Sequence, residues 1–234
     1  MKGGVILFRG SGAAARRYVE ADRSRADEYY LGADDAVAEY AVLDGRGEVT
    51  ATHALSADEY EGWVDWINPG TGESMGTPRA AAVGMKGSPL FAEMTINAPK
   101  SLSVAAALHP DVSVALDAAQ QDALAEIRQW LGQHSVTRVG PRDAREVLPI
   151  ERMQVVGIRH KTSRAGDPHR HIHMQIGMRV WAAGKWRALD TAALFKQQGA
   201  IRALGTAVIA ASPELAEVLD RHGLTLDAAT GEVV

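Results

Sequence analysis

The segment Arg170–Val180 alternates between apolar and polar side chains along its whole length. Successive side chains of a β-strand point to opposite faces, so this pattern predicts a strand with one buried face and one polar face. The apolar set is Ile172, Met174, Ile176, Met178 and Val180, and the polar set is His171, His173, Gln175 and Arg179. Such a strand is typical of an antiparallel sheet that is covered by helices on one side.

Other segments extend this prediction. Phe91–Asn97 alternates in the same way, with Glu93 on the polar face, and Met153–His160 has the composition of a central strand. Ser56-Ala57-Asp58-Glu59 is a capping box that opens a helix through Trp66. Further helices are expected over residues 13–21, 99–108, 112–131 and 191–211 and from Ser212 to about His222. We predict an α/β (α+β) fold, a two-layer sandwich with a central antiparallel sheet, helices on one face and the active site on the open polar face.

Composition excludes several kinds of site. The 234 residues include no cysteine, which rules out disulfides, thiolate metal sites and cysteine nucleophiles. The apolar runs are too short to span a membrane, and no cleavage-like site follows the short apolar stretch near the N-terminus. We therefore expect a soluble, cytoplasmic protein.

Charge is unevenly distributed along the chain. The net charge is −4, and residues 27–61 hold ten acids and one base. Residues 138–187, in contrast, hold 11 basic and 4 acidic side chains, a net charge of +7. This distribution argues against an indiscriminate DNA-binding protein but is compatible with one that grips a single strand at one site.

A histidine cluster lies in the basic block. His169, His171 and His173 occupy alternate positions and therefore face the same side of the predicted strand, and His160 ends the preceding strand. Neutral imidazoles grouped on a polar face can bind a divalent cation and leave coordination positions open for a substrate. Spacing alone favours His169, His171 and His173 as the ligands.

The block from His160 to His173 resembles the histidine motif of the HUH endonucleases and is most similar to that of the MobF (TrwC/TraI-like) conjugative relaxases. The segment from Glu93 to Ser101 resembles that family's acidic strand and its Ala-Pro-Lys-Ser turn. Tyr18 and the pair Tyr29-Tyr30 lie where the family has its nucleophilic tyrosines. The three blocks occur in the family's order.

The resemblance implies one divalent metal ion, Mg²⁺ or Mn²⁺, with Zn²⁺ or Ni²⁺ as substitutes in a crystal. It assigns the ligands to His160, His171 and His173, which leaves His169 as a spare donor or a DNA contact. The implied reaction is nicking and rejoining of single-stranded DNA at a plasmid origin of transfer, through a 5′-phosphotyrosine.

The implied nucleophile is Tyr18, which Val19 follows where many relatives have a second tyrosine. Glu93 stands at the position of the family's active-site acid, usually Asp, as proton acceptor or as a partner of a ligand histidine. Tyr29 and Tyr30 correspond to a second tyrosine site for strand transfer. The candidate DNA contacts are Arg164, Lys100, Arg16, Arg17, His169 and Trp186.

The resemblance also implies a single relaxase domain over residues 1–234, whose helical part from about residue 190 to 234 is a candidate lid over DNA. We expect a monomer that is the N-terminal domain of a longer relaxase-helicase, with relaxosome accessory proteins and a coupling protein as partners. The alternatives are a rolling-circle replication initiator, a metal-dependent hydrolase or deaminase of a small substrate, and an inert DNA-docking module. In rolling-circle initiators the tyrosine usually follows the histidine motif, whereas Tyr18 precedes it.

Overall fold

The computed structural model describes residues 4–22, 38–141, 143–163, 165–227 and 230–234. Its centre is an antiparallel sheet in the order β1-β4-β8-β7-β2-β3, with β9 joined to β7 and β10 to β9, and β5 and β6 form a separate two-stranded sheet. The strands are β1 (Ile6–Phe8), β2 (Ala38–Asp44), β3 (Val49–Leu55), β4 (Phe91–Asn97), β5 (Val136–Val139), β6 (Glu146–Pro149), β7 (Arg152–Thr162), β8 (Pro168–Gly177), β9 (Arg179–Ala182) and β10 (Lys185–Ala188). The predicted antiparallel sheet and mixed α/β class are confirmed.

Strand β8 lies in the middle of the sheet, between β4 and β7. On its apolar face Ile172, Met174 and Ile176 are buried, as the alternation predicts. The predicted strand does not run unbroken to Val180, however. At Met178 the backbone leaves β7 and β4 and bonds instead to Leu90 and Leu189, so β8 ends and β9 begins. The sequence pattern hides this break because Met178 and Val180 stay buried on both sides of it.

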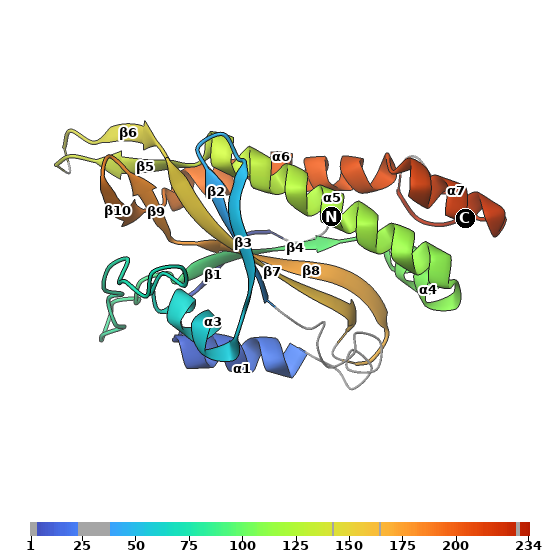
Figure 1. Ribbon diagram of the computed structural model, residues 1–234, viewed down its shortest axis with the longest axis horizontal. Coiled ribbons are helices and arrows are strands. Elements are labelled where there is room, and N and C mark those ends of the chain that lie inside the picture. The colour runs from blue at the N-terminus through green and yellow to red at the C-terminus, as the bar shows by residue number, and fades with distance from the viewer. Residues whose placement is uncertain (1–3, 23–37, 142, 164, 228–229) are drawn as a thin grey trace.

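One layer of helices covers the apolar face of the sheet (Figure 1). It consists of α4 (Lys100–Leu108), α5 (Pro110–His134), α6 (Thr191–Ala210) and α7 (Pro213–Arg221). The long α5 contacts β2, β4, β7 and β8, and α6 and α7 pack against α5. His222, the C-cap of α7, bonds through Nε2 to Asp111 Oδ1 at 2.9 Å.

None of the helices that the structure describes is long and apolar enough to cross a membrane.

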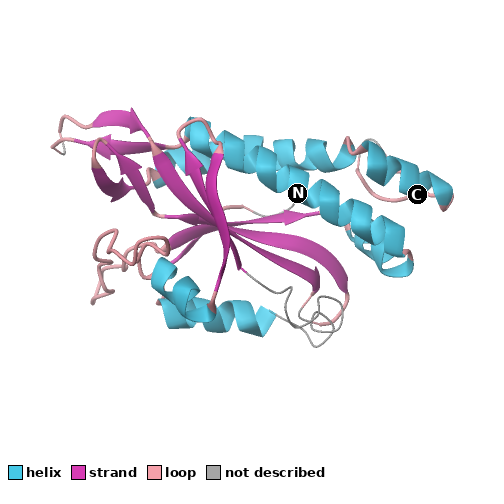
Figure 2. Cartoon of the chain, in the orientation of Figure 1, coloured by secondary structure: helices cyan, strands magenta, loops and turns pink. Residues whose placement is uncertain are grey.

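Two further helices, α1 (Gly12–Asp22) and α3 (Ala57–Val64), lie across the sheet from α5, as the cyan helices below the strands in Figure 2 show. The capping box predicted at Ser56 is present at the start of α3. From α3, Tyr60 and Trp63 bond to glutamines on the polar face of the sheet. The polar face is therefore not left open as expected, because α1 and α3 cover part of it.

Candidate active site

Three imidazoles meet on the polar face, where β7 and β8 pair. His160 of β7 is directly opposite His171 of β8, and His173 follows two residues later on the same face. The ring centroid of His160 lies 5.2 Å from that of His171 and 5.2 Å from that of His173. The ring centroids of His171 and His173 are 4.9 Å apart. All three side chains are buried. Strand register thus brings together the three histidines that the resemblance implies. The ring of His169, which spacing alone favours in place of His160, also lies close, with its centroid 4.7 Å from that of His171.

The nitrogens of His171 and His173 have the geometry of metal ligands. Their Nε2 atoms lie 3.2 Å apart. Two nitrogens bound at about 2.1 Å to one ion, at tetrahedral or octahedral angles, are about 3.0–3.4 Å apart, so the observed separation fits a shared cation. In the part of the chain that the structure describes, no group of three ligating side chains is already closed around one point.

The other ring nitrogens of these two histidines face acceptors. His171 Nδ1 lies 2.8 Å from the backbone oxygen of His169, and His173 Nδ1 lies 3.0 Å from Oε1 of Glu93. In His171, an N–H held in this way on Nδ1 leaves the lone pair on Nε2 for a metal and fixes the plane of the ring. The His173–Glu93 contact has the distance of an ion pair, without the geometry of a hydrogen bond. Burial, with the neighbouring imidazoles, lowers the pKa of His171 to about 4, so this ring is neutral at physiological pH.

Tyr18 approaches this cluster from α1. Its hydroxyl donates to Oε1 of Glu93 at 3.3 Å, and its ring meets that of His173 edge-on at 6.2 Å between centroids. Glu93 is 3% exposed and lies on β4, opposite Gln175 of β8. The predicted nucleophile, the predicted acid and the predicted ligands are therefore in contact.

The remaining predicted residues are distributed differently. Arg16 pairs with Glu20 at 2.6 Å and with Glu61 of α3 at 3.2 Å, and these contacts raise the pKa of its guanidinium. Arg17 is exposed. Tyr29, Tyr30 and Arg164 lie outside the described residues.

Lys100 lies at the histidine end of the sheet. It forms an exposed ion pair with Asp167 at 3.3 Å, and burial together with the charge of Lys100 lowers the pKa of His169. The end of the chain returns to this place, because the backbone N–H of Val233 donates to Ser101 Oγ at 2.8 Å. Helices α6 and α7, in contrast, lie on α5 across the sheet from the histidines.

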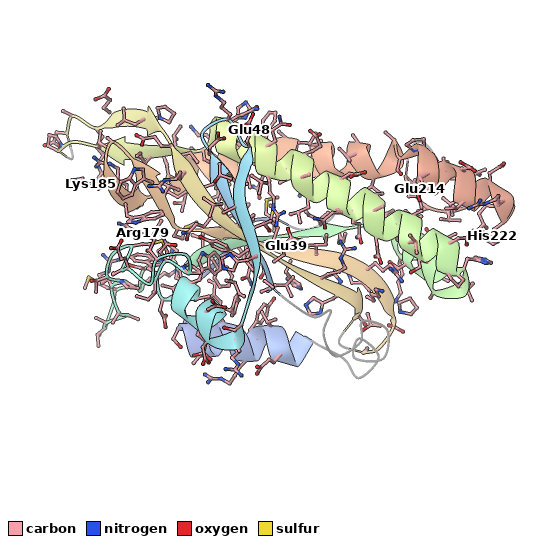
Figure 3. All side chains as sticks on the ribbon, viewed as in Figure 1. Glu39, Glu48, Arg179, Lys185, Glu214 and His222 are labelled. Carbon is pink, nitrogen blue, oxygen red and sulfur yellow. The ribbon has the colours of Figure 1, made fainter. Side chains whose placement is uncertain are left out.

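Part of the positive charge of residues 138–187 is paired with acids from outside this block. Arg138 pairs with Asp190 at 2.6 Å and Arg170 with Asp117 at 2.6 Å, two acids from outside the block. Arg179 bonds to backbone oxygens of Met75 and Trp186, and burial lowers its pKa. Arg179, in β9, and Lys185, in β10, lie far from the α7 end of the molecule (Figure 3).

Trp186, the tryptophan chosen as a candidate for base stacking, packs edge-on against Trp181 with 5.5 Å between ring centroids.

Two residues that the sequence analysis did not assign also belong to the site. Gln175 donates to Glu93 Oε2 at 3.0 Å and accepts from the hydroxyl of Tyr60 at 2.8 Å. The alternation placed Gln175 on the histidine face, but no local signal marks Tyr60.

Comparison with known proteins identifies the family. The TrwC relaxase model matches residues 12–233. This chain belongs to the TrwC relaxase family. No curated protein sequence matches it. The match supports the relaxase interpretation rather than a rolling-circle initiator or a small-molecule hydrolase.

Solved structures agree on the fold. The copper-bound complex of the conjugative relaxase TrwC with oriT DNA is 22% identical, with a TM-score of 0.71, over 98% of this chain and 74% of that one. A metal-bound TrwC–oriT complex is 21% identical, with a TM-score of 0.70 and the same coverage. TrwC bound to a 27-mer with the recognition hairpin and the cleavage site is 21% identical, covers 98% of this chain and 73% of that one, and has a TM-score of 0.66.

Proposed function

We propose that this domain cuts one DNA strand at a plasmid origin of transfer, keeps the cut end as a 5′-phosphotyrosine on Tyr18 and later rejoins it, which initiates conjugative transfer. One observation carries the proposal. Oε1 of Glu93 lies 3.3 Å from the Tyr18 hydroxyl and 3.0 Å from Nδ1 of His173. A single carboxylate oxygen thus connects the candidate nucleophile with the candidate metal ligands.

The chemistry follows from these contacts. The Tyr18 oxygen attacks the scissile phosphorus while the phenolic proton moves to Glu93 along the existing hydrogen bond. The bond from phosphorus to the 3′ oxygen breaks, and that oxygen takes a proton from solvent to become a 3′-OH. One phosphodiester replaces another, so attack by a 3′-OH on the phosphotyrosine reverses the step and rejoins a strand.

His160, His171 and His173 would hold the metal, for which we propose Mg²⁺ or Mn²⁺. A bound divalent cation supplies polarisation of the non-bridging phosphate oxygens and offsets the charge that develops on them. Glu93 and the His169 carbonyl keep the rings of His173 and His171 turned toward that position.

The DNA would approach from the end of the sheet where Lys100 and His169 lie, with Arg17 exposed on the tyrosine helix. A single strand fits the proposal better than a duplex, because Tyr18 is half-buried and its hydroxyl lies at Glu93 on the sheet. For the conjugative transfer that follows the reaction, we propose relaxosome proteins and a coupling protein in the cytoplasm as partners.

The test is covalent capture. Single strands from candidate origins of transfer, labelled at the 3′ end, are incubated with the protein and Mg²⁺ or Mn²⁺ and resolved on a denaturing gel. The 3′ fragment carries the 5′ phosphate, so the label should migrate with the protein. Tyr18→Phe should abolish this adduct. Tyr40→Phe, which changes a buried tyrosine of β2 outside the site, should retain it.

An adduct of undiminished yield in Tyr18→Phe, or no adduct with any strand under either metal, would overturn the proposal. Tyr29→Phe with Tyr30→Phe tests the second tyrosine site separately. This double variant should form the first adduct normally and lose transfer of the bound end to a second strand.

A further inference from the structure

A buried chain of hydrogen bonds leads from α3 to the Glu93 carboxylate. The hydroxyl of Tyr60 donates to Gln175 Oε1 at 2.8 Å, and Gln175 Nε2 donates to Glu93 Oε2 at 3.0 Å. Tyr60 is 5% exposed, Gln175 0% and Glu93 3%. Three elements that are distant in sequence, α3, β8 and β4, thus contribute one link each.

The direction of this chain is determined by its first donor. Burial raises the pKa of Tyr60, so its hydroxyl remains protonated. Because that hydroxyl donates to the side-chain oxygen of Gln175, the amide nitrogen of Gln175 points toward Glu93. Gln175 and Glu93 are also directly paired residues of adjacent strands, so the backbone register already places the two side chains opposite each other.

The consequence appears at the other carboxylate oxygen. With Oε2 held by the amide, Oε1 faces both the Tyr18 hydroxyl and His173 Nδ1. A buried carboxylate whose second oxygen lost its donor would gain rotational freedom and lose compensation for its desolvation. The contact of the Glu93 carboxylate with the His173 ring would then weaken as well.

We propose that Gln175 and Tyr60 are positioning residues, which orient Glu93 so that it holds the His173 ring in its metal-binding orientation. This inference rests on the proposed function, since it takes His173 as a metal ligand. The hydrogen bonds of the two residues lead to the site through Glu93.

The structure provides a matched control on the same face of the sheet. Trp63 of α3 donates through Nε1 to Gln154 Oε1 on β7 at 3.1 Å, and Gln154 is 2% exposed. As in the Tyr60–Gln175 bond, an aromatic side chain of α3 donates a hydrogen bond to the side-chain oxygen of a buried glutamine. The amide nitrogen of Gln154, however, donates to Asn68 and not to Glu93. Loss of Gln154 therefore reports the general cost of removing a buried amide.

The experiment measures binding of Mn²⁺ and of Ni²⁺ by isothermal titration calorimetry to the whole chain, after circular dichroism has verified folding. Gln175→Leu should weaken metal binding about tenfold to a hundredfold, the usual effect of removing a group that orients a ligand. Tyr60→Phe, the milder variant, should weaken it about threefold to tenfold. The double variant should bind no more weakly than Gln175→Leu alone, because Tyr60 acts through the amide. Gln154→Leu should bind as the wild type does.

A second measurement needs no metal. In the metal-free protein, the ¹⁵N shifts of the imidazole should show His173 with its proton on Nδ1, and Gln175→Leu should shift it toward a mixture of the two tautomers. Gln154→Leu should leave this spectrum unchanged.

The outcomes distinguish a failure of the proposed function from a failure of the positioning role of Gln175 and Tyr60. A wild-type protein that binds neither metal would overturn the proposed function and this inference together. Two results, each with normal metal binding by the wild type, would overturn the inference alone. One is an undiminished metal affinity of Gln175→Leu. The other is a loss of metal affinity in Gln154→Leu that equals the loss in Gln175→Leu.

Discussion

The burial of His171 among other imidazoles makes the stability of the metal-free protein depend on pH. Burial lowers the pKa of this histidine from 6.5 to about 4 in the folded protein. Between these values the unfolded chain binds a proton at this position and the folded chain does not, so the free energy of unfolding decreases as the pH falls from about 6.5 to about 4. At about 1.4 kcal/mol for each pH unit, the expected loss is about 3 kcal/mol.

The assay is urea unfolding, followed by circular dichroism, of the metal-free wild type and of His171→Gln at pH 7, 6, 5 and 4.5. Carboxylates also titrate in the lower part of this range, so the informative quantity is the difference between the two proteins. His171→Gln has no imidazole to protonate and should lose less stability on acidification, the difference approaching about 3 kcal/mol near pH 4. His53→Gln, which changes an exposed histidine of β3, is the control for removal of an imidazole.

One result would refute this reasoning. If the unfolding free energies of the wild type and His171→Gln run parallel from pH 7 to pH 4.5, the folded protein accommodates a charged His171 without cost. The neutral, metal-ready state of this histidine would then not be imposed by its surroundings.

Three further predictions concern other parts of the site. A divalent metal at about a hundred times its dissociation constant should stabilise the protein by about 2.7 kcal/mol and raise the midpoint of thermal unfolding by about 5–10 °C. Differential scanning fluorimetry should show this shift in the wild type and not in His173→Ala. Asp117→Asn removes the carboxylate that lies 2.6 Å from the buried Arg170 and 3.2 Å from Arg159. It should lower the unfolding free energy in urea by about 2 kcal/mol, less than for a fully buried pair because Asp117 is partly exposed. Arg17→Ala should weaken binding of single-stranded DNA, measured by fluorescence anisotropy, more than Arg16→Ala does, because Glu20 and Glu61 already neutralise Arg16.

Periodicity identified much of the fold because it is a local property. The alternation around His171 and the capping box at Ser56 each depend on residues only a few positions apart, and both are present in the structure. Helix α5 also follows its apolar spacing closely. The same local reasoning could not find the end of β8 at Met178, where the backbone changes partners while the side chains remain buried.

Charge was harder to interpret along the sequence. The count for residues 138–187 gives a net charge of +7, but Asp117 and Asp190 lie outside that range and pair with two of its arginines. Arg16 likewise has a partner that is distant in sequence, Glu61 of α3. Ion pairs join residues that are distant along the chain, and a sum over neighbours in sequence does not include such partners.

The sequence by itself determined which face of which strand carries the imidazoles, because side chains alternate along a strand with a period of two whatever the rest of the chain does. It also determined, through the resemblance of its motifs, where to look for the tyrosine and the acid. Only the tertiary structure decided that α1 brings the Tyr18 hydroxyl to Glu93, that the β4–β8 register sets Glu93 opposite Gln175, and that α3 supplies Tyr60. These contacts span 75 to 115 positions of the chain, and packing of the helices and pairing of the strands create them.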